Sequence, residues 1–299
     1  MRHPLKVWRD PADNLSPLRI IALACLFAPL LKALYDANDI LNGARPINDL
    51  IHRAGFWAIV FLLITVSVSP LRRIARFNQL LDVRRMLGVG AFTYAFAHIL
   101  LFTADKMFSL TMVVGEILFR VYLTIGFAAL LGLTALAATS TDGMVRRLGV
   151  KRWQRLHQAV YLIAILALIH FFQQNKADVS VPTIAAGLFG WLIGYRLLVK
   201  FRNTRAEPPS WMLLALTVAM TVLTFICEAI GIGIVFHVSP MRVLQSAFDF
   251  EWDMIRPGWY VLAAGLCVVA LDLVRARFAK PRRAASAPKA TLAAQKRAG

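Results

Sequence analysis

The stretch WQRLHQAVYLIAILALIHFF, residues 153–172, is long and apolar enough to cross a lipid bilayer, yet it contains His157 and His170. A transmembrane helix needs about 20 mostly apolar residues. Such runs occur at residues 20–36, 54–71, 86–103, 116–139, 157–173, 182–199, 211–236 and 258–273, and the fifth of them covers most of this stretch. The sequence therefore predicts an all-α polytopic membrane protein, a helical bundle of about eight transmembrane spans.

Basic residues distinguish the two sides of this bundle. The chain has a net charge of +18, and Lys and Arg are concentrated in the loops 72–85 and 141–156 and in the tail after residue 273. The loops 104–115 and 174–181 hold one Lys each. Because basic loops remain in the cytoplasm, we expect both termini there. No basic patch interleaved with aromatic residues occurs, so nucleic acid is not a predicted partner.

Composition divides the chain into four parts. We expect residues 1–19 to form a cytoplasmic N-terminus, 20–200 a six-span bundle, 201–273 a two-span extension, and 274–299 a basic, disordered cytoplasmic tail near lipid headgroups. The first span begins too late for a removable signal peptide, so we expect it to be retained. No GxGxxG motif follows a strand-like run, which excludes a flavin or nicotinamide domain of the Rossmann type.

The cysteines Cys25, Cys227 and Cys267 lie inside separate apolar runs. They form neither a CxxC nor a CxxCH motif, which argues against c-type haem attachment and against a cysteine-ligated iron–sulfur cluster. We expect them to be small buried residues of the bundle.

His98 and His170 lie inside spans, where an ionisable side chain without a partner is costly. Both helices start from the basic side, and at about 1.5 Å per residue both histidines lie roughly 20 Å from it. They fall at similar depth on two parallel helices. Bis-imidazole haem ligation requires two neutral rings facing each other in this way. The alternative is that each ring only hydrogen-bonds a carbonyl on a neighbouring helix.

His157 lies about 20 Å nearer the basic side and is rotated roughly 140° from His170 on an ideal helix. Either that helix is distorted or His157 serves a different site. Zinc is disfavoured because no carboxylate or cysteine stands beside these histidines at ligand spacing. Arg53 and Arg120 open spans on the opposite side of the membrane. They would act as interfacial anchors or would pair with haem propionates.

Several motifs resemble one protein family. The block TSTDGMVRRLGVKRWQRLHQAVYLIAILALIHFF (139–172), the segments GVGAFTYAFAHILLF, GEILFRVYLTIG and VSVSPLRR, and Gly55 shortly after His52 resemble the MsrQ (YedZ) family of the ferric-reductase-like transmembrane group. The resemblance covers roughly residues 18–200. It implies one or two b-type haems with His98, His157 and His170 as iron ligands, and bound FMN at residues that the motifs do not identify.

The resemblance also implies a role as an inner-membrane electron-transfer subunit of an oxidoreductase complex rather than a stand-alone enzyme. Electrons would come from the quinone pool, pass through flavin and haem, and reach a periplasmic molybdopterin-containing subunit that reduces methionine sulfoxide in proteins. Bis-histidine haem has no open iron position, which suits electron transfer. A chain without a nicotinamide domain needs another electron source, and a lipid quinone reaches a membrane bundle directly.

Three alternatives remain at this point. The chain could be a ferric or other metal reductase fed by a separate flavin reductase, a transporter with span histidines as a proton relay, or an anchor for its partner. Transport is disfavoured because paired broken spans are missing from the pattern.

The extension at 201–273 departs from the family pattern, with Glu228 inside a span and His237 at its outer end. We expect packing helices with an interfacial loop. The alternative is a docking surface for the outer partner or a second cofactor site that uses His237.

Overall fold

The structure, a computed structural model, describes residues 15–175, 178–202, 207–249 and 255–278. Regular structure in these ranges is helical, without a β-strand, and eight helical segments are long and apolar enough to cross a membrane. The all-α bundle of about eight spans is therefore confirmed. The spans are α1 Pro17–Tyr35, α3 Pro46–Ile74, α4 Leu80–Asp105, α6 Val121–Ala138, the segment Val150–Gln174, α10 Ser180–Arg202, α11 Ser210–Phe236 and α13 Pro257–Phe278.

The spans differ in two places from the runs expected from sequence. The run at 116–139 is interrupted at Arg120, whose backbone is extended (φ −116°, ψ 105°), so that a short helix α5 (Leu110–Phe119) precedes α6. Thr124 Oγ1 donates to the carbonyl of Ile117 at 2.5 Å and satisfies one of the carbonyls left free at the end of α5. The segment 150–174 consists of α8 (Val150–His157) and α9 (Val160–Gln174).

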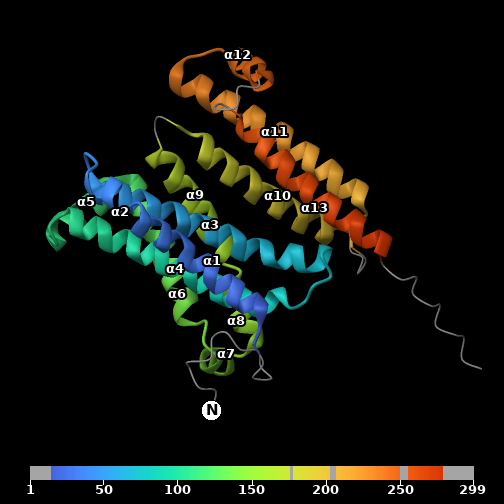
Figure 1. The fold of residues 1–299 in the computed structure, drawn as a ribbon, viewed down its shortest axis with the longest axis horizontal. Coiled ribbons are helices and arrows are strands. Elements are labelled where there is room, and N and C mark those ends of the chain that lie inside the picture. The colour runs from blue at the N-terminus through green and yellow to red at the C-terminus, as the bar shows by residue number, and fades with distance from the viewer. Residues whose placement is uncertain (1–14, 176–177, 203–206, 250–254, 279–299) are drawn as a thin grey trace, which may run out of the picture.

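Short helices lie between the spans. They are α2 Ala37–Leu41, α7 Asp142–Leu148, α12 Pro240–Gln245 and the 3₁₀ helix η1 Ser246–Phe248. Figure 1 shows α2 and α5 together at one end of the bundle, and α7 and α8 at another. Residues 1–14 and 279–299 lie outside the described residues, and so does most of the expected basic tail.

The core of the bundle lies around α3, which packs along α4, while α6 packs along α9. Small residues allow close contact between these helices: Ala91 on α4 and Ala164 on α9 are completely or almost completely buried. α10 joins this core to α11 and α13, which run side by side at the edge of the molecule (Figure 1). One polar contact across this junction is the hydrogen bond from Trp191 Nε1 to Thr217 Oγ1, at 3.0 Å.

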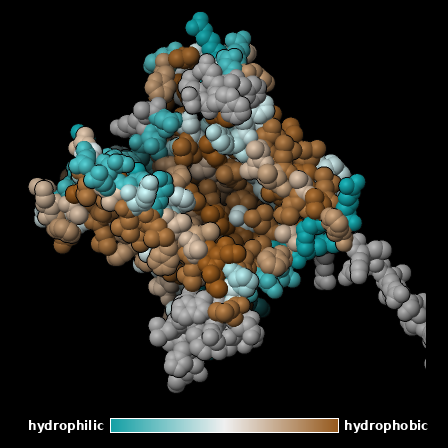
Figure 2. Space-filling model, viewed as in Figure 1, coloured by the Kyte–Doolittle hydropathy of each residue, from teal (hydrophilic) through white to brown (hydrophobic). Residues whose placement is uncertain are grey.

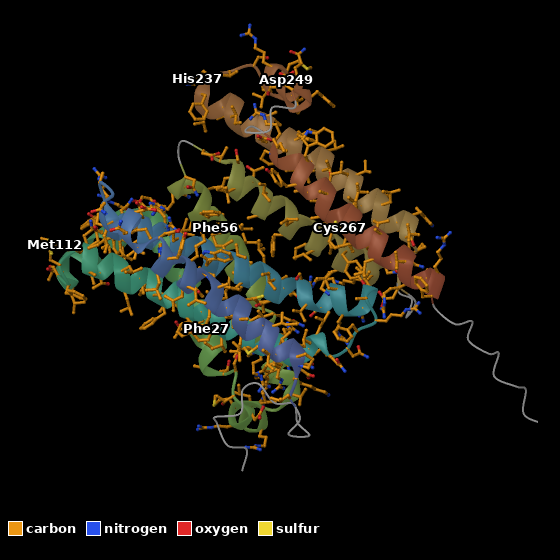
Figure 3. The ribbon with its side chains drawn as sticks, viewed as in Figure 1. Phe27, Phe56, Met112, His237, Asp249 and Cys267 are labelled. Carbon is orange, nitrogen blue, oxygen red and sulfur yellow. The ribbon has the colours of Figure 1, made fainter. Side chains whose placement is uncertain are left out.

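The outward faces of the spans are apolar. Figure 2 shows hydrophobic residues over the middle of the molecule and hydrophilic residues gathered towards its ends. Cys25, Cys227 and Cys267 lie on such outward faces and are exposed (Cys267 is labelled in Figure 3), so the expectation that they are buried is wrong. In a membrane bundle the face towards lipid is as apolar as the face towards the core, so hydropathy alone does not separate them.

Candidate functional site

A cavity of about 700 Å³ opens among α3, α4, α5, α6 and α9. Its walls are mostly apolar and include Ile59, Leu62, Phe102 and Leu130. Charged residues from the helix ends line it as well: Arg45, Asp105, Lys106, Glu116 and Arg120. An apolar chamber with a charged rim is suited to a ligand that has an apolar body and an ionised edge.

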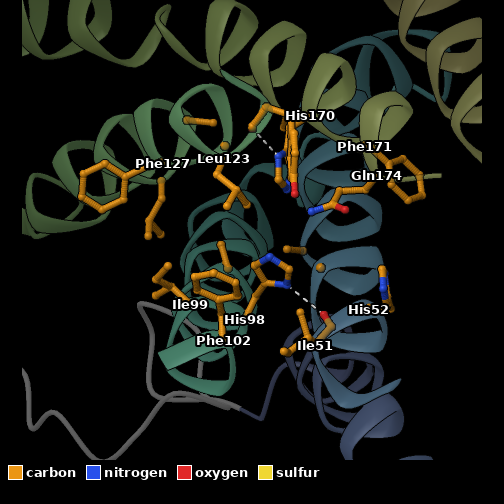
Figure 4. Close-up of a pocket in the computed structure, with 18 of the residues that line it drawn as sticks. Ile51, His52, His98, Ile99, Phe102, Leu123, Phe127, His170, Phe171 and Gln174 are labelled. Atoms are coloured by element: carbon orange, nitrogen blue, oxygen red, sulfur yellow. Dashed lines mark hydrogen bonds between the residues drawn. The ribbon is translucent and has the colours of Figure 1, made fainter. Parts of the chain in front are cut away.

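The rings of His98 and His170 project into this cavity from α4 and α9 (Figure 4). Their centroids are 6.2 Å apart and their planes are nearly perpendicular, at 83°. Two imidazoles that bind one metal ion from opposite sides, each at about 2.0 Å, have ring centres about 6 Å apart. The two rings therefore already stand at the spacing of an axial ligand pair.

Backbone carbonyls fix the orientation of both rings. His98 Nδ1 lies 2.8 Å from the carbonyl oxygen of Ile51, and His170 Nδ1 lies 2.7 Å from that of Tyr122. A carbonyl only accepts, so these contacts place the proton on Nδ1 and leave Nε2 unprotonated. A histidine that binds a metal through one nitrogen commonly donates its other N–H in this way.

A glycine lies one helical turn beyond each of these carbonyls. A Cβ atom built on Gly126 would come within 2.7 Å of the His170 ring, and one on Gly55 within 3.0 Å of the His98 ring. Each histidine thus has the same support: a carbonyl for Nδ1 and, four residues later, a glycine against which the ring packs. The missing side chains give the rings the space to stand at this angle.

Of the two arginines predicted from the sequence as candidates for pairing with propionates, Arg120 and Arg53, one lies at the cavity rim and the other does not. Arg120 lines the cavity and pairs with Glu116, with 2.7 Å from Nε to Oε2. Arg53 is not among the lining residues and pairs with Asp36 at 2.9 Å. The hydrogen bond from Arg53, followed by that from Lys32, lowers the pKa of the Asp36 carboxyl. Sequence reasoning missed Arg45 and Lys106, whose only signal was their position next to the predicted spans.

His157 lies in a second cavity, of about 280 Å³, together with Ser140, Trp153 and Tyr161. Its Nδ1 contacts the carbonyl of Trp153 at 3.1 Å, and the two rings stack with centroids 4.0 Å apart. Gln158 and Ala159 interrupt the helix directly after it. The helix is therefore distorted between His157 and His170, and the two rings also line different cavities.

Three arginines line the cavity of His157: Arg84, Arg85 and Arg196. Arg196 was not singled out from the sequence, although an arginine inside the apolar run 182–199 is a usable signal. Leu62 and Leu133 line both cavities, so one apolar layer lies between them. His237 ends α11 in a left-handed conformation (φ 55°) and lines neither cavity; Figure 3 shows it at the far end of the extension.

Apolar spans around a facing pair of imidazoles define a multi-pass membrane protein with a candidate bis-imidazole metal site. The family model described as the ferric reductase like transmembrane component matches residues 51–168 and identifies the class of this bundle. Among curated proteins, a protein-methionine-sulfoxide reductase heme-binding subunit MsrQ of Xanthomonas oryzae pv. oryzae is 43% identical over 168 residues, covering 55% of this chain and 77% of the relative. The chain belongs to the MsrQ family and is a multi-pass protein of the bacterial inner membrane.

Two further relatives extend the match. The Rhodospirillum rubrum protein of the same name is 40% identical over 197 residues, covering 65% of this chain and 93% of the relative. The Ralstonia nicotianae protein is 35% identical over 198 residues, covering 65% and 91%. No solved structure matches the chain. About a third of the chain therefore has no counterpart in these alignments.

Proposed function

We propose that this chain moves electrons across the inner membrane through a b-type haem held between His98 and His170, and delivers them to a periplasmic protein-methionine-sulfoxide reductase. The observation that carries the proposal is the ring pair: two facing imidazoles, 6.2 Å between centroids, with both Nε2 atoms free. The relatives are named as heme-binding subunits of that reductase, which supports the same reading.

The residues present fit haem. Among the described residues, no group of three or more histidine, cysteine or carboxylate side chains could hold a metal ion by itself, so two imidazoles need a ligand that fills the other metal positions. A cavity of about 700 Å³ with apolar walls has room for such a macrocycle. Arg45, Lys106 and Arg120 would hold its propionates at the rim. When bound, haem supplies a one-electron centre without an open iron position.

The residues around the ring pair would orient the imidazoles, exclude water and face the acceptor. Ile51 and Tyr122 keep the protons on Nδ1, so that both Nε2 atoms stay available. Phe102, Leu130 and other wall residues keep water away from the centre, which tunes its potential. With the basic loops in the cytoplasm, the Arg120 rim faces the periplasm, where the acceptor would dock.

Electron input belongs at the opposite end. We propose that quinol supplies the electrons, that a flavin (FMN) takes part, and that the acceptor is a molybdopterin-containing subunit; these points rest on the family resemblance. The cavity of His157 is less than half as large as that of the ring pair, and within the described residues no second histidine lines it. His157 is therefore better suited to the electron-input site than to a second bis-imidazole haem.

The match to the ferric reductase like transmembrane component favours one second candidate, a haem-dependent ferric reductase fed by a separate flavin reductase. Both functions need the same haem and differ in the acceptor. To separate the two functions, purified protein is reduced with quinol and then mixed with one of two acceptors. One acceptor is ferric citrate, and the other is the periplasmic reductase together with oxidised protein substrate. The acceptor that reoxidises the haem faster identifies the function.

The first test is a dithionite-reduced minus oxidised absorption spectrum of the detergent-purified protein. We expect the sharp α band of six-coordinate b-type haem. Protein expressed with ample haem that shows no such band would overturn the proposal and return the histidines to a role in packing or proton transfer.

A further inference from the structure

Among the described residues, the arginines around the cavity of His157 outnumber the acidic groups that could neutralise them. Arg84, Arg85 and Arg196 line the cavity, and none of its described lining residues is a carboxylate. Arg85 Nη1 pairs with Asp142 Oδ1 at 2.6 Å, so its charge is balanced outside the cavity. Two guanidinium groups, those of Arg84 and Arg196, are left without a carboxylate partner in the described part of the chain.

Within the described ranges, the groups that fix Arg196 in place are neutral. Its Nε donates to the hydroxyl of Tyr161 at 2.9 Å and its Nη2 to the carbonyl of Val66 at 2.8 Å, and the guanidinium lies 4.9 Å from the Tyr161 ring centre. Nη1 donates to Leu192 in the preceding turn. These contacts join α3, α9 and α10 around one cation, and they orient the charge without cancelling it.

Arg84 is half-buried at the start of α4 and makes no hydrogen bond or ion pair to other described residues. It lines the same cavity as Arg196, so their like charges repel. Glu207, an acidic residue of the same region, accepts from Tyr195 and is not among the lining residues. Holding two like charges together in a membrane bundle is unfavourable unless an anion joins them.

We propose that this cavity binds the phosphate group of a ligand, with the phosphate between Arg84 and Arg196. Guanidinium groups pair with phosphate through parallel N–H donors, and a phosphomonoester carries about two negative charges at neutral pH, one for each unpaired arginine. Trp153 and His157, stacked on each other, offer an aromatic surface for the rest of the ligand.

The phosphate has two possible sources, a nucleotide-type cofactor and an anionic lipid with a phosphomonoester headgroup. Among the described lining residues, Leu62 and Leu133 are the two shared with the cavity of His98 and His170, so a redox-active ligand here would be one apolar layer from the ring pair. Placing the flavin in this cavity rests on the proposed function, whereas phosphate binding does not.

The test uses two ligands that differ only in phosphate, FMN and riboflavin, titrated calorimetrically into the full chain in nanodiscs. We expect FMN to bind about tenfold more tightly than riboflavin, as one or two charge-assisted contacts would give. Arg84→Gln should bring the ratio close to one. Arg196→Gln should also bring the ratio close to one, but this change removes contacts between helices as well. Arg84→Gln is therefore the decisive variant, because Arg84 makes no hydrogen bond or ion pair to another described residue.

Arg202→Gln is the matched control, because Arg202 lies on α10, donates to the carbonyl of Glu207 and does not line the cavity. The lipid source is tested with nanodiscs of phosphatidate against phosphatidylcholine, with retained lipid measured by native mass spectrometry. Phosphatidate retention that Arg84→Gln removes, with no preference for FMN, would support phosphate binding and identify a lipid.

The proposal would be overturned if FMN bound no more tightly than riboflavin and phosphatidate were retained no better than phosphatidylcholine. It would also be overturned if either preference persisted in Arg84→Gln. Haem absorption is recorded on the same samples. If protein that binds no haem still prefers the phosphate-bearing ligand, the proposed function would be contradicted and the phosphate site would still be supported.

Discussion

The imidazoles of His98 and His170 stand 6.2 Å apart, nearly perpendicular, and each is held by a carbonyl of a different helix. Ile51 on α3 orients the first ring and Tyr122 on α6 orients the second. Four helices therefore contribute to one ligand pair. A rigid pair that is set before the metal arrives reduces the ordering that binding requires.

The first prediction concerns the ligands themselves. His98→Ala and His170→Ala should each abolish the six-coordinate b-type spectrum, because one axial ligand does not complete the coordination. His237→Ala is the control, since His237 lines neither cavity, and it should leave the spectrum unchanged. Haem per protein and the reduced-minus-oxidised spectrum are measured together. A normal spectrum in either His98→Ala or His170→Ala would show that the pairing is wrong.

The second prediction concerns the glycines under the rings. Gly126→Ala should displace the His170 ring, because the added Cβ would lie 2.7–2.9 Å from three of its atoms. Gly55→Ala should have a weaker effect, since its Cβ would come no closer than 3.0 Å to the His98 ring. We expect a loss of haem occupancy or a change in the low-spin electron paramagnetic resonance signal, which reports the angle between the rings.

Gly115→Ala provides the matched control, because a Cβ there meets nothing within 4 Å and α5 should tolerate or favour alanine. If Gly126→Ala left both haem content and the resonance signal as in Gly115→Ala, the ring would not depend on this glycine.

Part of this site follows from sequence by arithmetic. A rise of about 1.5 Å per residue from the basic loops places His98 and His170 at one depth, and the structure brings them into contact range. The carbonyl partners do not follow from sequence, because they depend on how α3 and α6 are rotated. Gly55 was noted as part of a motif, but only the structure shows that its missing side chain accommodates a ring.

Other features escaped sequence reasoning for a physical reason. Hydropathy does not tell the face towards lipid from the face towards the core, which is why the three cysteines were wrongly expected to be buried. The break at Arg120 was hidden inside a continuous apolar run. The uncompensated charge of Arg196 is visible only in the structure, because it depends on the neutral groups that contact the guanidinium.

The third prediction concerns the charged rim. Arg120→Gln removes a positive charge beside the proposed haem and should lower the midpoint potential, because positive charge favours the reduced form. Glu116→Gln should raise it. The shifts should be a few tens of millivolts at most and should shrink at high salt, because both residues are accessible to solvent.

Arg53→Gln serves as the comparison for the rim, since Arg53 pairs with Asp36 and does not line the cavity. Redox titration at two salt concentrations is the measurement. A shift in Arg53→Gln as large as that in Arg120→Gln would mean that the rim has no special part in setting the potential.

The last prediction concerns the extension. Glu228 is almost completely buried (side chain 2% exposed) on α11 and pairs with Arg256 at 3.3 Å, and Arg256 also donates to Ser246 Oγ at 2.6 Å. Together these contacts hold η1 against the spans. Glu228→Gln should lower stability by about 1–3 kcal/mol, because it leaves a partly buried arginine without its counter-ion.

Thermal unfolding in detergent measures this loss, and Arg256→Gln completes a double-mutant cycle that isolates the pair. Asp272→Asn, which keeps an acceptor for Ser210 Oγ at another contact of α13, should lower stability less. The haem spectrum of Glu228→Gln should remain normal, because no described residue of α11, α12 or α13 lines the His98–His170 cavity. A lost spectrum with an unchanged melting temperature would instead connect Glu228 to the cofactor site and contradict a purely structural role.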